Sequence, residues 1–278
     1  MINYNENFIN ESEHDLLNRG FLYGDSVFES IKIINNKIIF WEDHYMRLMS
    51  SMRITRIEIP QNYTPEFFRI QILNTISKLN SNFSGRVRLS VFREGGGYYA
   101  PSSMSPSFII HCVITESNNF FIKNSDFKVD LFKDYYVQDN LLSNLKTNNK
   151  LINVLAGIYS NENNLDNCIL LNNKKNVAEF LNGNLFIVNQ KKIKTPSLDS
   201  GCLNGVMRKK IIEYFKFFPE YNLEETTISP FELLSVQEIW LTNSISGIVP
   251  ITSYRNKKFT NDFAKIFINF LNKKVADH

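Results

Sequence analysis

The sequence lacks the features that mark disulfide-stapled, metal-bound and membrane-spanning proteins. It has only 3 cysteines, Cys112, Cys168 and Cys202, which are far apart and form no CxxC pair. No pair of histidines lies near them, which speaks against a disulfide framework and a structural zinc site, so we expect no metal. No apolar run approaches the roughly 20 residues of a membrane span. The segment before Gly20 is polar and acidic, so we expect no signal peptide and a cytoplasmic protein.

No charge of one sign dominates the chain either. Its 31 lysines and arginines face 28 acidic residues, a net charge of +3 without charged blocks, which argues against a nucleic-acid or membrane partner. The hydrophobic content of 43% indicates a globular protein, and 278 residues suit two domains of roughly 100 to 150 residues each. We therefore expect a small-molecule ligand, with an anionic one among the options.

The first part of the chain alternates predicted strands and helices, which is typical of an α/β fold class. Arg47 lies one residue off the apolar stripe of its helix, where it could also be an exposed cation with a packed stem. Arg86 and Arg88 share one face of an alternating strand. We predict strands over 26–34, 38–41, 85–92 and 107–114 and helices over 42–53 and 64–79. The expected domains are residues 1–118 and 131–278, with a linker over 119–130.

Two charged residues of the second part admit an ordinary and a chemical interpretation. We expect a helix after Leu145 that buries Leu151, Val154 and Leu155. Lys146 then precedes its first turn, as an exposed lysine or, if burial or a nearby cation lowers its pKa, as a nucleophile. Glu179 lies in a predicted three-stranded meander over 168–188 and is the sole charge amid Val177, Ala178, Phe180 and Leu181. It either faces water or is buried beside a cationic N–H group.

The segment 200–214 predicts an anion-binding helix start. A loop with two glycines enters an amphipathic helix, whose first backbone amides can bind a phosphate. Arg208, Lys209 and Lys210 crowd the first turn and oppose the helix dipole unless a negative group is nearby. The alternative is an ordinary helix capped by Asn204. A predicted strand over 238–250 adds Asn243 and Ser244, which are turn formers or further anion ligands.

Six segments resemble the class IV aminotransferases, the fold type IV pyridoxal-phosphate enzymes, in order and in rough spacing. They cover residues 18 to 250 approximately: NRGFLYGDSVFESIKI, HYMRLMSSM, LKTNNKLINVLA, VAEFLNGNLFIV, TPSLDSGCLNGVMR and WLTNSISGIVP. The resemblance implies a small N-terminal α/β domain and a larger C-terminal domain, with the cofactor pyridoxal 5'-phosphate between them.

The resemblance also assigns roles to individual positions. Lys146 matches the catalytic lysine that binds the cofactor covalently and moves the proton at the substrate Cα. Glu179 matches the carboxylate that pairs with the protonated pyridine nitrogen. The other matching positions hold the phosphate or pack under the ring: Arg47, Leu203, Gly205, Val206, Met207, Asn243 and Ser244.

Substrate contacts are expected from the first domain. Arg88 sits where branched-chain aminotransferases carry an arginine, whereas the Arg-x-His trap of D-amino-acid aminotransferases is absent from REGGGYYAPS. The candidates for contacts to substrate carboxylates are Phe28, Lys32, Arg88, Arg93, Tyr98 and Tyr99.

Three functions stay open at this point. The first is an aminotransferase that moves an amino group between an amino acid and a 2-oxo acid. The second is a 4-amino-4-deoxychorismate lyase that releases pyruvate and 4-aminobenzoate, and the third is a non-catalytic relative used for binding or assembly. The resemblance also implies a homodimer in which a loop of the partner completes the site.

Overall fold

The structure is a computed structural model that describes residues 2–9, 18–79, 82–115, 119–123 and 125–276. Residues 10–17 of the N-terminal segment and residue 124 of the expected linker lie outside this range. The chain forms two compact units. The first comprises residues 1–119 with Lys146–Asn149, and the second comprises Phe120–Leu145 with Lys150–His278. Residues 146–149 therefore belong to the first unit, although the chain on both sides of them belongs to the second.

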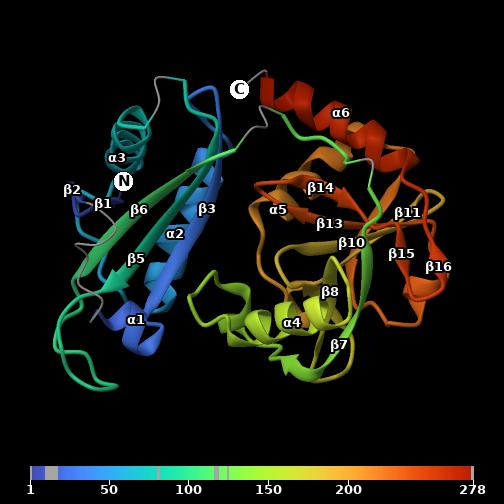
Figure 1. The fold of residues 1–278 in the computed structure, drawn as a ribbon, viewed down its shortest axis with the longest axis horizontal. Coiled ribbons are helices and arrows are strands. Elements are labelled where there is room, and N and C mark those ends of the chain that lie inside the picture. The colour runs from blue at the N-terminus through green and yellow to red at the C-terminus, as the bar shows by residue number, and fades with distance from the viewer. Residues whose placement is uncertain (1, 10–17, 80–81, 116–118, 124, 277–278) are drawn as a thin grey trace. The chain divides into compact units, whose positions relative to one another are not determined.

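The first unit is an antiparallel sheet of six strands, in the order β2-β1-β6-β5-β3-β4, with α2 and α3 packed on it (Figure 1). The strand predicted over 38–41 is the shorter β4, because Trp41 already begins α2. The elements are β1 (Ile2–Tyr4), β2 (Asn7–Ile9), α1 (Arg19–Tyr23), β3 (Ser26–Ile34), β4 (Lys37–Ile38), α2 (Trp41–Ile54), α3 (Pro65–Ser77), β5 (Gly85–Arg93) and β6 (Pro106–Ile114).

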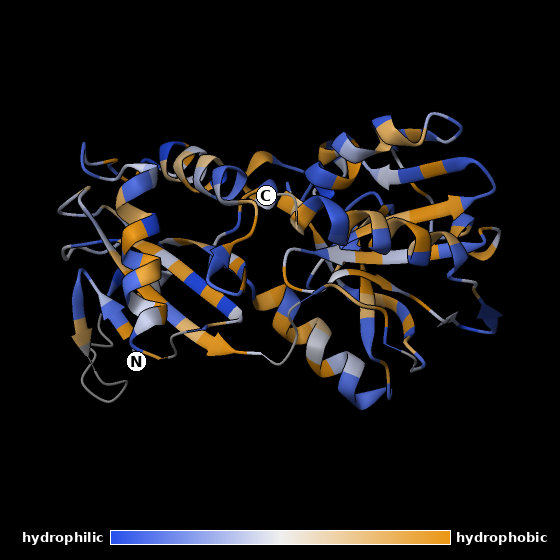
Figure 2. Cartoon of the chain, turned by 90° about the horizontal axis from the view of Figure 1, so that it is seen from above, coloured by the Kyte–Doolittle hydropathy of each residue, from blue (hydrophilic) through white to orange (hydrophobic). Residues whose placement is uncertain are grey.

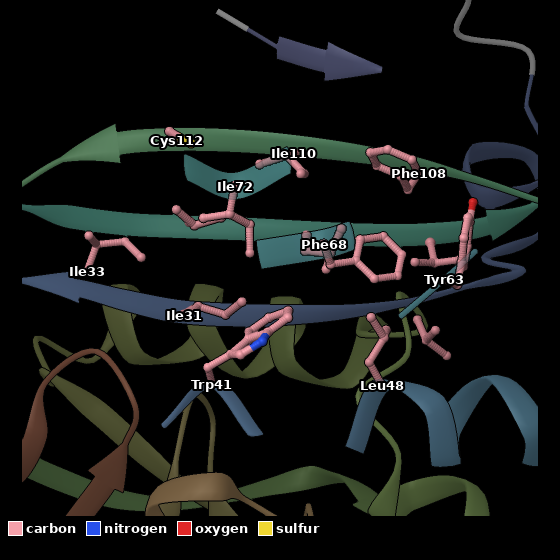
Figure 3. Close-up of a cluster of buried hydrophobic side chains, with 14 of the residues drawn as sticks. Ile31, Ile33, Trp41, Leu48, Tyr63, Phe68, Ile72, Phe108, Ile110 and Cys112 are labelled. Atoms are coloured by element: carbon pink, nitrogen blue, oxygen red, sulfur yellow. The ribbon is translucent and has the colours of Figure 1, made fainter. Parts of the chain in front are cut away.

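Alternation of apolar and polar residues gives this sheet one apolar face, which packs on the core, and one more polar face. Val87, Leu89 and Val91 of β5 are fully buried, and the residues between them point to the other face. Bands of both colours run along the strands in Figure 2. Each buried aliphatic side chain contributes roughly 1.5 to 3 kcal/mol to folding. Figure 3 shows the core that forms against the apolar face, with Ile31, Ile33, Trp41, Leu48, Tyr63, Phe68, Ile72, Phe108 and Ile110 among its members.

The second unit contains two sheets of five strands, in the orders β12-β11-β10-β13-β14 and β16-β15-β7-β8-β9. Its helices of more than one turn are α4 (Leu151–Glu162), α5 (Val206–Tyr214) and α6 (Asp262–Ala276). Its strands are β7 (Lys128–Val137), β8 (Asn167–Asn172), β9 (Val177–Phe180), β10 (Asn184–Asn189), β11 (Lys192–Pro196), β12 (Asn222–Thr226), β13 (Glu238–Asn243), β14 (Gly247–Pro250), β15 (Ser253–Tyr254) and β16 (Lys257–Lys258).

Two strand predictions in this unit were wrong in their connections. The three strands expected as one meander over 168–188 are divided between the two sheets, since β8 pairs with β9 whereas β10 pairs with β11 and β13. Among the residues that the structure describes, an isolated bridge between Phe180 and Gly183 joins β9 to the turn before β10. The segment 238–250 is a hairpin of β13 and β14 rather than one strand. Strand propensity located these strands but could not choose their partners.

The lysine segment also differs from its prediction. Helix α4 begins at Leu151, and Leu151 and Val154 are 71% and 57% exposed instead of buried. The face of α4 that packs on Phe132 and Leu170 carries Ala156 and Leu155. Residues 147–150 therefore separate Lys146 from α4. Among the helices that the structure describes, none is long and apolar enough to cross a membrane.

Candidate active site

Lys146 is held at the sheet of the first unit. Its carbonyl oxygen accepts a hydrogen bond from the Phe28 amide at 2.8 Å, and Thr147 forms an antiparallel bridge with Val27. The Lys146 Nζ lies 4.6 Å from the centroid of the Phe28 ring, and the Arg88 Cζ lies 3.6 Å from the same centroid. An amine, an aromatic ring and a guanidinium are therefore brought together.

Arg88 is oriented by neutral hydrogen-bond acceptors. Its Nη2 donates to Asn148 Oδ1 at 2.8 Å, and its Nε donates to Ser90 Oγ at 3.2 Å. Burial, and then the charge of Arg86, lower the pKa of Arg88 to about 10. The guanidinium still carries its charge at neutral pH, and its bonds fix the direction in which it can bind an anion.

Arg47 belongs to a buried cluster with Glu29 and His44 on the core side of the same sheet. Arg47 donates to both Glu29 oxygens, from Nε at 2.8 Å and from Nη2 at 2.5 Å, and His44 Nδ1 donates to Glu29 Oε2 at 2.6 Å. Burial alone would raise the pKa of Glu29, but Arg47 and then His44 lower it to about 2. Burial lowers the pKa of His44, more than its bond to Glu29 raises it. The cluster thus fixes Arg47 in one orientation.

In the second unit, Glu179 is a buried carboxylate bonded to the loop before α5. The residue is 7% exposed, and its Oε2 accepts a hydrogen bond from the Leu203 amide at 2.9 Å. The neighbours on β9 are the apolar Val177, Ala178 and Phe180. Of the two interpretations of Glu179, the structure therefore favours the buried one. A carboxylate in such surroundings is well placed to bind a cationic N–H group.

The loop before α5 ends in a helix N-terminus without a side-chain cap. The N-cap residue is Gly205, so the alternative of a cap by Asn204 was wrong. A Cβ atom at Gly205 would collide with Asn184 Oδ1, and Gly201 has a φ of 82°, in the region that favours glycine. The first amides of α5, at Val206 and Met207, therefore have the arrangement that binds anions.

The three cations of the α5 first turn pair with acidic residues. Arg208 Nη2 lies 2.6 Å from Glu225 Oε2, and Lys210 Nζ lies 3.1 Å from Glu213 Oε2. Lys209 Nζ lies 3.7 Å from the other oxygen of Glu213. The predicted need for nearby negative groups is thus met by the protein itself.

Asn243 forms a turn between β13 and β14. Its Oδ1 accepts hydrogen bonds from the amides of Ile245 and Ser246 at 3.0 and 2.8 Å. This is the turn-forming interpretation that the sequence left open. A contact from Asn243 or Ser244 to a phosphate stays a prediction.

Two substrate candidates differ in how the structure holds them. Arg93 is buried and donates to Asp25 Oδ2 at 3.1 Å and to the Thr55 carbonyl at 2.7 Å, so its described bonds fix the end of β5 rather than reach outward. Tyr98 is 84% exposed, and its carbonyl accepts a hydrogen bond from Arg19 Nη1 at 2.8 Å. Arg19 and Arg93 share Asp25 and together anchor the glycine-rich loop that presents Tyr98 and Tyr99.

Sequence reasoning missed several positioning residues. Asn144 Nδ2 donates to the carbonyls of Leu198 and Cys202, and Asn184 Nδ2 donates to that of Leu203. Asn148, Glu29 and His44 were missed in the first unit. A signal existed only for Glu29, which is the one charge among the apolar inward positions of β3. Asparagine is too abundant in this chain for Asn144, Asn148 or Asn184 to stand out.

The chain is similar in sequence and in fold to several known proteins. Residues 26–254 match the family model described as amino-transferase class IV. The chain is 26% identical over 251 residues to an aminodeoxychorismate lyase of Vibrio harveyi, which covers 88% of this chain and 89% of the relative. It is 25% identical over 248 residues to a D-alanine aminotransferase of Bacillus licheniformis, with 86% and 82% covered. A branched-chain aminotransferase of Thermoproteus uzoniensis has a similar fold, with a TM-score of 0.87 at 20% identity over 98% of this chain and 93% of that one.

Proposed function

Since the chain belongs to the class IV aminotransferase family, we propose that it is a pyridoxal-phosphate enzyme that moves an amino group between an amino acid and a 2-oxo acid. The observation that carries the proposal is the position of Lys146 beside Phe28 and Arg88. A lysine amine can bind the cofactor covalently, and an arginine near it can hold a substrate carboxylate.

The residues present fit the cofactor on chemical grounds. The buried Glu179 carboxylate suits a protonated pyridine nitrogen, and the uncapped start of α5 suits a phosphate. When bound, pyridoxal phosphate supplies an electron sink that accepts the electrons of the bond broken at the substrate carbon. We propose that Glu179 holds the pyridine N–H and that Leu203 packs under the ring. The phosphate would be held by Arg47, by the amides of Gly205, Val206 and Met207, and by Asn243 and Ser244.

The protein groups then have separable tasks. Lys146 would take the proton from the substrate Cα and pass it to carbon C4' of the bound cofactor, and it would move a proton in the reverse direction in the second half of the reaction. Arg88 holds the substrate carboxylate so that the Cα–H bond is presented to Lys146. Glu29 and His44 act through Arg47, whose orientation they fix. All of these groups belong to the first unit: Lys146, Arg88, Arg47, Glu29 and His44.

The test is a turnover assay on purified protein supplied with pyridoxal phosphate. We expect a visible absorbance band from the bound cofactor, its loss on addition of one class of amino acid, and exchange of the amino group with 2-oxoglutarate. A panel of L- and D-amino acids then names the donor. A protein that takes up no cofactor would refute the proposal and favour a non-catalytic binding or assembly protein.

A second candidate is 4-amino-4-deoxychorismate lyase. It is favoured by the lyase of Vibrio harveyi, which is similar over most of both chains, and by the absence of the Arg-x-His pattern in the loop after β5. The same cofactor residues serve both reactions, so they do not separate them. Release of pyruvate and 4-aminobenzoate from aminodeoxychorismate, without exchange with 2-oxoglutarate, would replace the first proposal by this one.

We also propose that the enzyme is a homodimer in the cytoplasm. Leu151, Val154 and Ile158 are 71%, 57% and 48% exposed and recur along one side of α4, and the exposed Leu141 and Leu142 precede them in the chain. Exposed apolar surfaces of this kind are typical of protein interfaces. The three cysteines are buried thiols, which suits a reducing compartment.

The assembly can be tested by light scattering at micromolar concentration. The wild-type protein should have the mass of two chains, and Val154→Glu should have the mass of one, because a charge in an apolar interface is costly. Ile266→Glu, at another exposed apolar position, is the matched control and should stay dimeric. A monomeric wild type would count against the proposal.

A further inference from the structure

One peptide group of the loop before α5 joins Asn144 to Glu179. The N–H of the peptide between Cys202 and Leu203 donates a hydrogen bond to Glu179 Oε2 at 2.9 Å. The carbonyl oxygen of the same peptide, on Cys202, accepts a hydrogen bond from Asn144 Nδ2 at 2.7 Å. Asn144 ends the short 3-10 helix η2 (Leu141–Asn144), whereas Glu179 lies on β9. Two distant parts of the second unit therefore meet at the two ends of one peptide.

This connection has an electrostatic consequence for Glu179. A donor at the carbonyl oxygen makes the N–H of the same peptide a stronger donor, because hydrogen bonds in a chain polarise one another. The peptide group is planar, so a bond that fixes its carbonyl also fixes the direction of its N–H. A hydrogen bond from a backbone N–H stabilises the negative charge of a carboxylate. Asn144 therefore supports both the strength and the direction of the bond that Glu179 accepts.

Asn144 is itself held by the loop on which it acts. Its Nδ2 also donates to the Leu198 carbonyl at 3.0 Å, and its own carbonyl accepts a hydrogen bond from the Asn204 amide at 3.1 Å. With the bond to the Cys202 carbonyl, these contacts bind Asn144 to both ends of the segment 198–204. The side-chain amide is thus fixed in direction before any ligand binds.

Other asparagines contact the same loop at different peptides. Asn172 Nδ2 donates to the Ser200 carbonyl at 3.2 Å, and Asn184 Nδ2 donates to the Leu203 carbonyl at 2.7 Å. Neither carbonyl belongs to the peptide whose N–H reaches the carboxylate. Of these three asparagine side chains, Asn144 is therefore the one bonded to that peptide.

The side chain of Cys202 adds no second negative charge beside Glu179. Its Sγ donates to the carbonyls of Pro196 and Ser197 at 3.6 and 3.5 Å. Burial, and then the charge of Glu179, raise the pKa of Cys202 to about 12. The thiol therefore stays neutral at neutral pH, and the carboxylate is the anion that the peptide N–H serves.

We infer that Asn144 is a positioning residue that acts on Glu179 through the Cys202–Leu203 peptide and strengthens the contact of Glu179 with a protonated ring nitrogen. The inference rests on the proposed function, since that nitrogen is the pyridine N–H of pyridoxal phosphate. The role needs no contact between Asn144 and the cofactor. It predicts that a ligand without the ring nitrogen is bound equally well with and without the Asn144 side chain.

The test compares two ligands of the full-length protein, pyridoxal phosphate and its 1-deaza analogue, in which a C–H group replaces the ring nitrogen. Both ligands carry the aldehyde and the phosphate, so their contact with Glu179 is what differs. Asn144→Ala should raise the dissociation constant of pyridoxal phosphate about 3- to 10-fold, the usual effect of one lost hydrogen bond. The constant of the analogue should change less than about twofold. Equilibrium dialysis measures both constants without recourse to activity.

Three further variants separate the role of Asn144 from support of the fold. Asn144→Asp keeps the shape but loses the donor, so it should weaken binding of pyridoxal phosphate at least as much as Asn144→Ala. Asn153→Ala is the matched control, because Asn153 Nδ2 donates to the Leu181 carbonyl at 2.7 Å in the same unit. It should change neither constant more than about twofold. In the double variant of Asn144→Ala and Glu179→Gln, the loss should be smaller than the product of the two single losses, because both act at one carboxylate.

A second measurement does not need the cofactor. In the cofactor-free protein, Asn144→Ala should speed the hydrogen exchange of the Leu203 amide about tenfold or more, because the peptide loses the bond that fixes it. Asn153→Ala should leave this rate unchanged. If the wild-type protein binds neither ligand, the proposed function fails, while the exchange rate still decides whether Asn144 supports the Leu203 amide.

The inference is overturned by any of three results. One is an equal loss of affinity for both ligands in Asn144→Ala, which would mean that Asn144 only supports the loop. Another is a double variant whose loss equals the product of the two single losses, since Asn144 would then act independently of Glu179. The third is a Leu203 amide that exchanges at the wild-type rate in Asn144→Ala.

Discussion

The two faces of the β3–β5 pair use charged residues in opposite ways. On the core face, Glu29 is bonded to Arg47 and His44, so charges of opposite sign are satisfied within the protein. On the other face, Arg86 and Arg88 are bonded to neutral side chains. We propose that the first arrangement stabilises the fold and orients Arg47 for its proposed phosphate contact, and that the second keeps positive charge for an anionic ligand. Substitutions on the two faces should therefore change different properties.

The largest expected effect is that of Lys146→Ala. Removal of the amine should lower the rate of amino-group transfer at least about 1000-fold, because the group that moves the substrate proton is lost. The visible absorbance of the lysine-bound cofactor should disappear, and the melting temperature should change little. Lys150→Ala, at the start of α4, is the matched control and should keep its activity. Residual activity above one tenth of the wild-type rate would show that Lys146 is not the group that moves the substrate proton.

Glu29→Gln tests the core face. The change leaves Arg47, whose side chain is 11% exposed, without its carboxylate. We expect a loss of about 3 kcal/mol in the free energy of unfolding, measured with urea. Glu42→Gln, at an exposed position of α2, should cost less than about 0.5 kcal/mol. Arg86→Gln on the other face should not lower stability, because it removes a charge that faces another cation. If Arg86→Gln is the more destabilising variant, the comparison of the two faces is wrong.

The acid dependence of stability follows from the same cluster. The folded-state pKa of Glu29 is about 2, below its ordinary value of 4.5. A lowered carboxylate pKa contributes stability that is fully present above about pH 4.5 and is lost as the pH falls toward 2, roughly 3 kcal/mol in total. Urea unfolding at several pH values should show this loss. Glu29→Gln should lack this part of the dependence, and an unchanged slope in that variant would contradict the assignment.

The smallest effect is expected for Asn148→Ala. The variant removes the acceptor that orients Arg88, so the KM for the substrate should rise about threefold to tenfold. The value of kcat should change little, because Lys146 stays in place. A fall in kcat at constant KM would mean that Asn148 acts on Lys146 instead. Asn163→Ala, at the end of α4, is the matched control.

The differences between expectation and structure have a common physical origin. Periodicity placed β3, β5, β6, α2 and α3 within a residue or two, since local alternation reports which face is buried. Periodicity failed for Leu151 and Val154, because an apolar stripe on a helix does not show which of its residues pack against the rest of the same chain. It also failed for β9 and β10, because strand pairing depends on partners far along the chain.

By itself, the sequence determined β3, β5, β6, α2 and α3 of the first unit and the family resemblance, and it singled out Lys146 and Glu179 as candidates. These depend on local pattern and on residue identity. Only the tertiary structure decided that residues 146–149 join the first unit, that Asn148 orients Arg88, and that Lys32 lies opposite Arg86. Such pairings depend on strand register and chain reversal, which bring together residues that are 54 to 120 positions apart.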